Sequence, residues 1–342
     1  MHSLARKGWQ VLATTGLYTE CLELGITEST ALENFDTACR FTTTPGDCQS
    51  IIDLAINLGL GTLSSMATVK GDFMLAKILL GTFMLALTMT TQAENSNAFD
   101  HEHTLWHQLL QKHVYWIDNG VASQVDYQSF RREHAILDAY LDNLSRVSKD
   151  EFAQWPQEQQ LAFLINAYNA FTVRLILNHW PVDSIRDIGG WFNNPWKMDF
   201  FTFLGQPRHL DWIEHEVIRE PGRFNEPRIH FAVNCAAIGC PALRNEAYVG
   251  ERLTYQLEDQ TRRFLSDANR NRYRNGRFEL SSIFKWYRED FQRGWQGIDS
   301  LAEFIAPYAN TLGGPSLSRI KKNQHLIEIN FLNYDWALNG KH

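Results

Sequence analysis

The chain has 342 residues, of which 44% are hydrophobic and 21% are charged, and its net charge is −7. This length is sufficient for one large domain or two average domains with a substantial core. The mildly acidic charge, without a basic stripe or an arginine-rich run, predicts that nucleic acid is not a partner.

Residues 74–93 have the layout of a secretory signal peptide. Lys77 supplies a positive charge, residues 78–89 form an uncharged apolar run, and residues 91–93 form a small-residue cleavage site. The apolar run is shorter than the roughly 20 residues that a membrane span needs. We therefore expect a periplasmic or secreted protein with no stable membrane span after cleavage of the signal.

This layout would place the start of translation at Met74. Residues 1–73 are then an upstream extension or the product of a mis-called start. The alternative is a protein anchored in the membrane through residues 73–90. Export would remove three of the five cysteines and leave Cys235 and Cys240, so a disulfide between these two becomes a serious possibility.

The mature chain is predicted to be one α+β domain whose first part is helical. Residues 94–157 form a helical lead-in, because apolar residues recur at helical spacing over 101–118 and 126–146. His103 lies near the start of this lead-in and is expected on the surface. Residues 158–342 form the α+β part, in which a buried central helix packs on a small, mainly antiparallel sheet.

The most informative helix is expected within residues 156–181. Its middle is apolar on nearly every side, which predicts that it is buried. Asn166 and Asn169 lie in this run and share one face. A buried amide without partners costs about 1–3 kcal/mol, so the two indicate either bonds to nearby backbone or a polar site. Ser148 and Glu151 form a capping box that is expected to open this helix.

The second half of the chain mixes short helices with short strands. Asn-Gly and Gly-Gly pairs, apolar alternation and possible capping residues mark the boundaries of these elements. In chain order we expect a strand at 198–204, a helix at 211–219 capped by Asp211, a strand at 228–234, a helix at 249–265, a hairpin at 272–280, helices at 281–291 and 300–309, and a strand at 325–332.

The predicted strand at 228–234 runs directly into Cys235. Strand alternation would put its isoleucine, phenylalanine and valine on the core face, and His230 with Asn234 on the opposite face. One selectively polar side suits the floor of a site better than a solvent-exposed surface. His230 and Cys235 are therefore the first candidates for a functional role.

Cys235 is a candidate nucleophile. A reactive thiolate needs a base or a positive environment that lowers the thiol pKa from about 8.5. His230 or His215 could supply that base. Asn166, Asn169 or Glu214 could orient the imidazole as the third member of a triad, and an asparagine could instead donate to an oxyanion.

Three other interpretations of the cysteines remain open. Cys235 and Cys240 could form a disulfide that closes a tight turn, or both could be reduced cysteines of the core. A zinc site with nearby histidines is the weakest interpretation, because no Cys-x-x-Cys or His-x-x-x-His pattern occurs here. We therefore expect neither a metal nor a cofactor. The histidines in question are His209, His215 and His230.

Five segments together resemble the domain-of-unknown-function 547 family, and in particular its bacterial exported members. The resemblance extends over roughly residues 158–339 and implies a domain without an assigned activity. The order of a polar-notched helix followed by a histidine-led strand is similar to thiol hydrolases and transglutaminases, although in those proteins the helix carries the cysteine. The segments are FLINAYNAFTVRLIL, LDWIEHEVIR, PRIHFAVNCAAIGCPALRNEAY, IFKWYREDF and FLNYDWALN. The family's hallmark segments fall on Asn166, Asn169, His215, His230 and Cys235.

The sequence therefore predicts an exported domain with a polar cleft between the central helix, the 211–219 helix and the 228–235 strand. If the cleft is catalytic, thiol-dependent acyl transfer or hydrolysis is the expected chemistry. The alternative is an inert module that binds a small molecule, a peptide, a glycan or another envelope component, with Cys235 and Cys240 as a structural pair.

Overall fold

The computed structural model describes residues 98–190, 194–315, 318 and 327–341, which belong to one compact unit. The signal-like segment 74–93 and residues 1–73 lie outside the described residues. Export and the possible anchor at 73–90 therefore stay predictions.

The first half of the unit is mainly helical, as expected. One difference is that the helix predicted over 101–118 ends at His113, and its last residues form a strand. Val114, Trp116 and Ile117 are β-branched or aromatic and favour a strand. A turn with positive φ at all three residues follows at 118–120. The elements are α6 (Thr104–His113), β1 (Val114–Ile117), β2 (Ala122–Val125), α7 (Tyr127–Arg132), α8 (His134–Arg146), α9 (Lys149–Gln154) and α10 (Gln157–Asn178).

The central helix α10 is buried on every side over most of its length, as predicted. By length and composition it could span a membrane, but 89% of its most apolar window is buried inside the unit, as in a core helix. The cap at Ser148 is present, because its side chain accepts a hydrogen bond from the Glu151 backbone at 3.1 Å, but it opens the separate short helix α9 and not α10, contrary to expectation.

Two strands pack against α10 through aromatic stacking. β3 (Phe201–Phe203) pairs antiparallel with β4 (Gln206–Arg208). The ring centroids of Phe171 and Phe201 lie 3.8 Å apart, and those of Phe163 and Phe203 lie 5.1 Å apart. Such contacts add to the hydrophobic gain of burying the rings.

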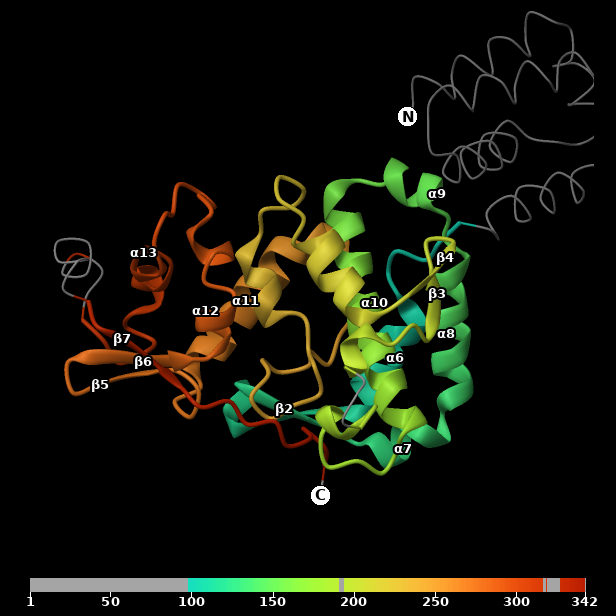
Figure 1. Ribbon diagram of the computed structural model, residues 1–342, viewed down its shortest axis with the longest axis horizontal. Coiled ribbons are helices and arrows are strands. Elements are labelled where there is room, and N and C mark those ends of the chain that lie inside the picture. The colour runs from blue at the N-terminus through green and yellow to red at the C-terminus, as the bar shows by residue number, and fades with distance from the viewer. Residues whose placement is uncertain (1–97, 191–193, 316–317, 319–326, 342) are drawn as a thin grey trace, which may run out of the picture. The chain divides into compact units, whose positions relative to one another are not determined.

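The second half of the unit has short elements around a mixed sheet (Figure 1). β6 pairs antiparallel with β5 and parallel with β7. The predicted Asn275-Gly276 turn is present, with φ of 53° and 84°, as a type I′ hairpin requires. The elements are a π-helix (Trp212–Ile218), a 3₁₀ helix (Pro227–Phe231), α11 (Leu253–Ser266), β5 (Arg272–Arg274), β6 (Arg277–Ser281), α12 (Ile283–Trp286), α13 (Leu301–Ile305) and β7 (Ile329–Leu332).

The expected strand at 228–234 is wrong, because residues 227–231 form the 3₁₀ helix. Pro227 fixes φ at the first helical position, and the Glu226 side chain accepts from the Arg228 backbone at the start of the helix. Over so few residues an alternating apolar pattern does not separate a strand from this tight helix.

The 3₁₀ helix lies where two hydrophobic clusters meet. Ile229 belongs to the cluster around α6–α10, and Phe231 belongs to the cluster around α11–α13 and β6. His230 is between them in sequence and is itself buried. The helix therefore joins the two halves of the core directly before the cysteines.

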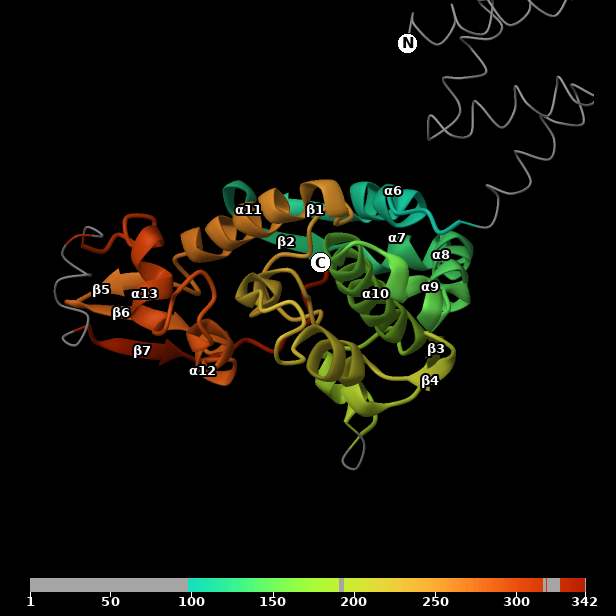
Figure 2. The same ribbon diagram turned by 90° about the horizontal axis from the view of Figure 1, so that it is seen from above.

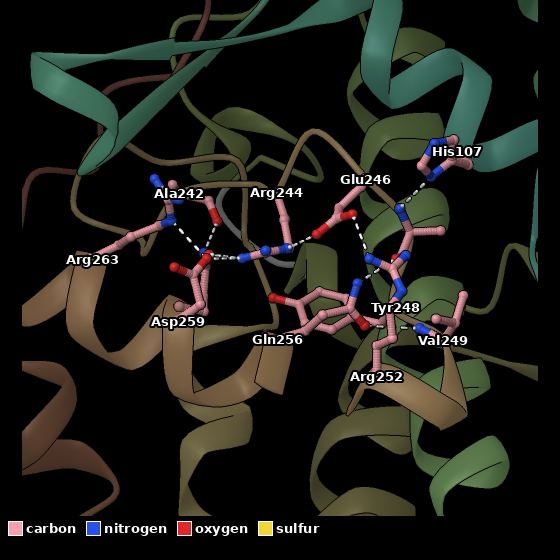
Figure 3. Close-up of polar contacts among 12 residues, drawn as sticks. His107, Ala242, Arg244, Glu246, Tyr248, Val249, Arg252, Gln256, Asp259 and Arg263 are labelled. Carbon is pink, nitrogen blue, oxygen red and sulfur yellow. Dashed lines mark hydrogen bonds and ion pairs between the residues drawn. The ribbon is translucent and has the colours of Figure 1, made fainter. Parts of the chain in front are cut away.

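Side chains of α11 fix the irregular loop that precedes it (Figure 3). Gln256 donates to the carbonyl of Ala247 at 2.8 Å and accepts from the backbone of Val249 at 3.0 Å. Arg244, within the loop, forms an ion pair with Asp259 at 2.5 Å. The bonds from Gln256 satisfy backbone groups of the loop that have no partner in a helix or a sheet.

Helix α11 also lies next to the first hairpin (Figure 2). The guanidinium of Arg263 lies 4.5 Å from the ring centroid of Trp116 on β1 and donates to the carbonyl of Gly120 at 2.7 Å. The second half of the chain is thereby attached to the helical lead-in.

His103 was expected on the surface, but it is 1% exposed. Its Nδ1 lies 2.7 Å from the hydroxyl of Tyr140, and its Nε2 has no partner in the described part of the chain. Burial lowers the pKa of His103 from 6.5 to about 3, because the charged imidazolium would lose its hydration.

This burial predicts a loss of stability in acid. Below pH 6.5 an unfolded chain binds a proton at His103, whereas the folded protein does so only near pH 3, so the free energy of unfolding falls as the pH falls. We expect His103→Asn to reduce that slope by about 1 kcal/mol per pH unit between pH 6 and 4. Asparagine can bond Tyr140 and tolerates the positive φ of 51° at this position.

The measurement is guanidinium unfolding at several pH values. His134→Asn is the matched control, because His134 is exposed, and it should retain the wild-type slope. An unchanged slope in His103→Asn would show that His103 is not the group that takes up the proton.

Candidate functional site

The structure brings four of the six predicted site residues to one cavity of about 250 Å³. They are Cys235, His230, His215 and Glu214. The walls come from segments far apart in the sequence, because α10, the π-helix, α12 and the chain after β7 converge there. The other lining residues are Tyr168, Trp196, Asp211, Val233, Cys240, Pro241, Ile283, Trp286, Tyr287, Tyr334 and Trp336.

Asn166 and Asn169 do not line the cavity, which corrects the expectation that they form one of its walls. Asn169 donates to the carbonyl of Ala232 at 3.0 Å and accepts from the backbone of Asn234 at 2.8 Å. Asn166 bonds both backbone groups of Tyr248 in the same way, at 2.7 and 3.0 Å. Both amides therefore position backbone, and Asn169 does so directly before the cavity cysteine.

An ionised carboxylate orients His230. Its Nε2 lies 2.7 Å from Oδ2 of Asp290, and the same carboxylate binds Arg219 at 2.5 Å and Arg293 at 2.7 Å. Burial would raise the pKa of Asp290, but the hydrogen bonds from His230 and Arg219 outweigh burial and hold the pKa well below its usual value. Asp290 thus fixes the imidazole as the acidic member of a catalytic triad does.

His230 is a neutral imidazole with one free nitrogen. Burial lowers its pKa more than Asp290 raises it, so at pH 7 it carries a single proton, on the Nε2 that faces Asp290. Its Nδ1 has no hydrogen-bond partner among the described residues. The ring stacks on Tyr287 at a centroid distance of 3.9 Å. Nδ1 is therefore a buried acceptor whose lone pair no described residue uses.

Glu214 is a buried carboxylate, 5% exposed. Its hydrogen-bond partners are the hydroxyls of Tyr168 and Tyr287. Burial and the charge of Glu214 raise the pKa of both phenols, so they remain neutral donors. No lysine, arginine or histidine forms an ion pair with Glu214 in the part of the chain that the structure describes.

His215 is engaged at both ring nitrogens. Nδ1 lies 2.6 Å from a guanidinium nitrogen of Arg219, and Nε2 lies 3.4 Å from a carboxylate oxygen of Asp211. These contacts make His215 a positioning group and a weaker candidate base. Asp211 makes no capping bond to the π-helix, contrary to expectation. His209 takes that role, because its Nδ1 accepts from the backbone of Trp212 at 3.0 Å.

Cys235 and Cys240 are free thiols in contact with each other. Cys235 is half-buried, whereas Cys240 is 3% exposed. The Cys240 sulfur accepts from the Cys235 backbone and from the hydroxyl of Tyr334, each at 3.0 Å. The same hydroxyl lies 3.2 Å from the Cys235 sulfur.

The two thiols titrate as a pair. Burial raises the pKa of Cys240, but hydrogen bonds from the Cys235 thiol, from Tyr334 and from the backbone outweigh burial and lower it. The hydrogen bond to Cys240, burial and the charge of Cys240 raise the pKa of Cys235 well above its usual value. The pair therefore shares one negative charge at a lower pH than a free thiol and resists a second.

The sequence did not identify Asp290, Arg219, Tyr168, Tyr287 or Tyr334 as site residues. Asp290 lies within the segment IFKWYREDF, where a carboxylate between aromatic residues is a usable signal. The tyrosines gave none, because a tyrosine in an apolar run is usually part of the core.

Other features of the unit do not compete with this cavity as the site. A second cavity of about 320 Å³ shares Cys240, Pro241 and Tyr334 with it, but Asp267 and Arg270, which line that second cavity, form an ion pair with each other. Among the described residues, no group of three or more His, Cys, Asp and Glu side chains is placed to bind a metal ion.

The two asparagines allow a matched test of how the site is positioned. Asn169→Ala leaves two buried backbone groups unpaired, so we expect the free energy of unfolding to fall by about 1–3 kcal/mol. We also expect a severalfold change in the alkylation rate of Cys235, whose preceding backbone loses its support.

Asn166→Ala is the control, because it removes the same pair of bonds from Tyr248 instead. It should lose similar stability without a change in alkylation. Chemical unfolding and timed alkylation measure the two effects. Equal alkylation rates in the two variants would contradict the assigned role of Asn169.

Comparison with known proteins confirms the resemblance for the part of the chain that holds most of the site. Residues 152–265 match the model of a family described as "Protein of unknown function, DUF547". His230 and Cys235 lie inside this match, whereas Asp290 and Tyr334 lie beyond it. No curated protein and no solved structure matches the chain, so a thiol-hydrolase-like core is not confirmed. Residues 152–265 are thus similar to the DUF547 family, whose activity is unassigned.

Proposed function

We propose that the cavity catalyses thiol-dependent acyl transfer or hydrolysis, with Cys235 as the nucleophile. The observation that carries this proposal is a pair of contacting thiols together with a carboxylate-bound histidine whose other nitrogen has no partner among the described residues. Both elements line the same cavity. A nucleophile, a base and a carboxylate that orients the base are the groups that such chemistry requires.

The two sulfurs have different roles in the proposed reaction. Cys240 is the better thiolate, but it is buried. Cys235 is the more exposed sulfur, and its proton can pass to Cys240 when it attacks. This arrangement supplies a nucleophile without a charged imidazole, in contrast to thiol enzymes in which a histidinium stabilises the thiolate.

In the acylation step, the Cys235 sulfur attacks the carbonyl carbon of the donor. A carbon–sulfur bond forms, and the bond to the leaving group breaks. The thiol proton moves to Cys240 as the sulfur attacks and then passes through Nδ1 of His230 to the leaving group. In the second step, water or another acceptor attacks the thioester and gives a proton to His230, which returns it to the departing Cys235 sulfur.

Asn166 and Asn169 have no chemical part in this scheme, since their amides are bonded to backbone. The hydroxyls of Tyr168 and Tyr287 are the hydrogen-bond donors nearest to Glu214.

A catalytically inert binding module is the second candidate function. It is favoured by the tryptophans among the lining residues. Trp286, 47% exposed, stacks on Trp336 at 5.8 Å, and Trp196 contacts Trp336 at the same centroid distance. Such rings could hold a peptide or a glycan without chemistry. The signal-like segment 74–93 supports a periplasmic or secreted location for either function.

Alkylation and acylation test the catalytic proposal. We expect iodoacetamide to label Cys235 without prior reduction, through an apparent pKa below the 8.5 of a free thiol. Cys240→Ser removes the thiol that carries most of the shared charge, so it should raise this apparent pKa of the pair and slow labelling at pH 7. With p-nitrophenyl acetate, mass spectrometry should find the acetyl group on Cys235, and Cys235→Ser should not form the adduct.

Thermal midpoints of both serine variants provide the control for folding. If neither cysteine reacts until the protein is reduced, the pair is a disulfide and the proposal fails. If Cys235 labels with the pKa of an ordinary thiol and never becomes acylated, the binding module is the better description.

A further inference from the structure

The ionisable lining of the cavity is acidic. Asp211 and Glu214 line it, and no lysine or arginine does. Asp211 is partly balanced by Lys197 at 3.7 Å, whereas Glu214 has only phenol partners. Arg219 lies near Glu214, but its guanidinium is bonded to other groups, Asp290 and His215.

A carboxylate this deeply buried is costly when no cation compensates it. Other buried charges of this protein are compensated. Arg228, 5% exposed, is paired with Glu226 at 2.7 Å, and Asp290 is bonded by two arginines. Among the described residues Glu214 is therefore exceptional, and a cationic partner for it would have to come from outside this part of the chain.

The second unused group in the cavity is also an acceptor. Nδ1 of His230 carries a lone pair and has no partner among the described residues. The hydroxyls and thiols that line the same space are already bonded to Glu214 or to one another. A ligand that suits both Glu214 and His230 must therefore bring N–H donors and a positive charge.

Most of the remaining lining residues are aromatic: Tyr168, Tyr287, Tyr334, Trp196, Trp286 and Trp336. The faces of such rings attract a cation, most strongly after it has lost its water. The chain already shows this preference beside the cavity, where the guanidinium of Arg219 lies 4.9 Å from the ring centroid of Tyr287.

From these acceptors and rings we infer that the cavity binds a primary ammonium group, held by Glu214 and by Nδ1 of His230, and that this amine is the acyl acceptor. The inference of an acceptor rests on the proposed acyl transfer, whereas the binding of the ammonium group does not. A sugar or a neutral peptide would leave the charge of Glu214 uncompensated.

In the transfer step, the amine replaces the Cys235 sulfur on the acyl group. The bound ammonium gives one proton to Nδ1 of His230, which passes it to solvent. The free amine attacks the carbonyl carbon of the thioester on Cys235. A carbon–nitrogen bond forms, the carbon–sulfur bond breaks, and the second amine proton goes to the departing sulfur. The products are an amide and the free thiol.

The test is calorimetric titration of the full chain with three probes: n-butylammonium, 1-butanol and tetramethylammonium. We expect n-butylammonium to bind at least tenfold more tightly than 1-butanol, which lacks the charge. It should also bind more tightly than tetramethylammonium, which has no N–H donor. Equal affinity for the amine and the alcohol would overturn the inference, and a preference for tetramethylammonium would assign a quaternary cation instead.

Variants locate the binding. Glu214→Gln should weaken n-butylammonium at least tenfold and leave 1-butanol unchanged. Glu216→Gln, an exposed neighbour on the same π-helix, is the matched control and should change neither. Unchanged ammonium affinity in Glu214→Gln would overturn the inference. If that variant does not fold, the comparison of the three probes on the wild-type protein still decides the question.

A separate experiment distinguishes this inference from the proposed function. The acetyl adduct of Cys235 is treated with n-butylamine, and the ratio of N-butylacetamide to acetate is measured. Amide formation in preference to acetate at millimolar amine supports both proposals. An adduct that yields only acetate overturns the amine acceptor alone, and binding of the amine without any adduct overturns the acyl transfer alone.

Discussion

The two hydrogen bonds between Asn169 and the backbone of residues 232–234 are the interaction on which the site depends. They join the fully buried helix α10 to a segment without regular structure. That segment leaves the 3₁₀ helix at the junction of the two hydrophobic clusters and leads to Cys235. An amide that satisfies a carbonyl and an N–H at once fixes both the position and the rotation of this backbone. The cavity can therefore have irregular walls and still hold its thiol in one place.

Electrostatics are a second constraint on the site. The surroundings of each ionisable group in the cavity determine whether that group is charged or neutral. Two arginines form ion pairs with the Asp290 carboxylate and stabilise its negative charge. The same carboxylate orients His230 through a hydrogen bond. Burial keeps that imidazole neutral. The same low-dielectric surroundings that make a neutral base possible also make the isolated charge of Glu214 expensive. The cavity thus contains a neutral base and hydrogen-bond acceptors, and a cation that balances Glu214 would have to come from a ligand.

The sequence predicted the elements whose signals are local. The burial of α10, the cap at Ser148 and the Asn275-Gly276 turn each follow from a few neighbouring residues, and each is present. The sequence predicts a strand where the 3₁₀ helix lies at 227–231, because five residues carry too little periodicity to distinguish a strand from a 3₁₀ helix. His103 was placed on the surface, because its burial depends on contacts with Tyr140 and other distant residues.

The residues of the site also divide into those that local sequence predicts and those that depend on distant contacts. Cys235 and His230 were found because cysteine and histidine carry chemistry wherever they occur, and they lie five residues apart. Asp290 lies sixty residues beyond His230, and the tyrosines around Glu214 come from two different helical segments. No local pattern connects such residues. The two asparagines were given chemical roles because their spacing is visible in the sequence, whereas the backbone groups that they bond are not.

The arrangement of Glu214 and the thiol pair links binding to reactivity. The negative charge of Glu214 opposes a thiolate at Cys235, and it adds to the larger effects of Cys240 and burial. Two like charges in a buried space repel more strongly than they do in water. A cation bound at Glu214 would remove that repulsion, so the Cys235 sulfur would become more nucleophilic when the cavity is occupied. The empty protein would keep its proton on Cys235, and an ammonium ligand would both complete the charge balance of the cavity and favour the reactive form of the thiol.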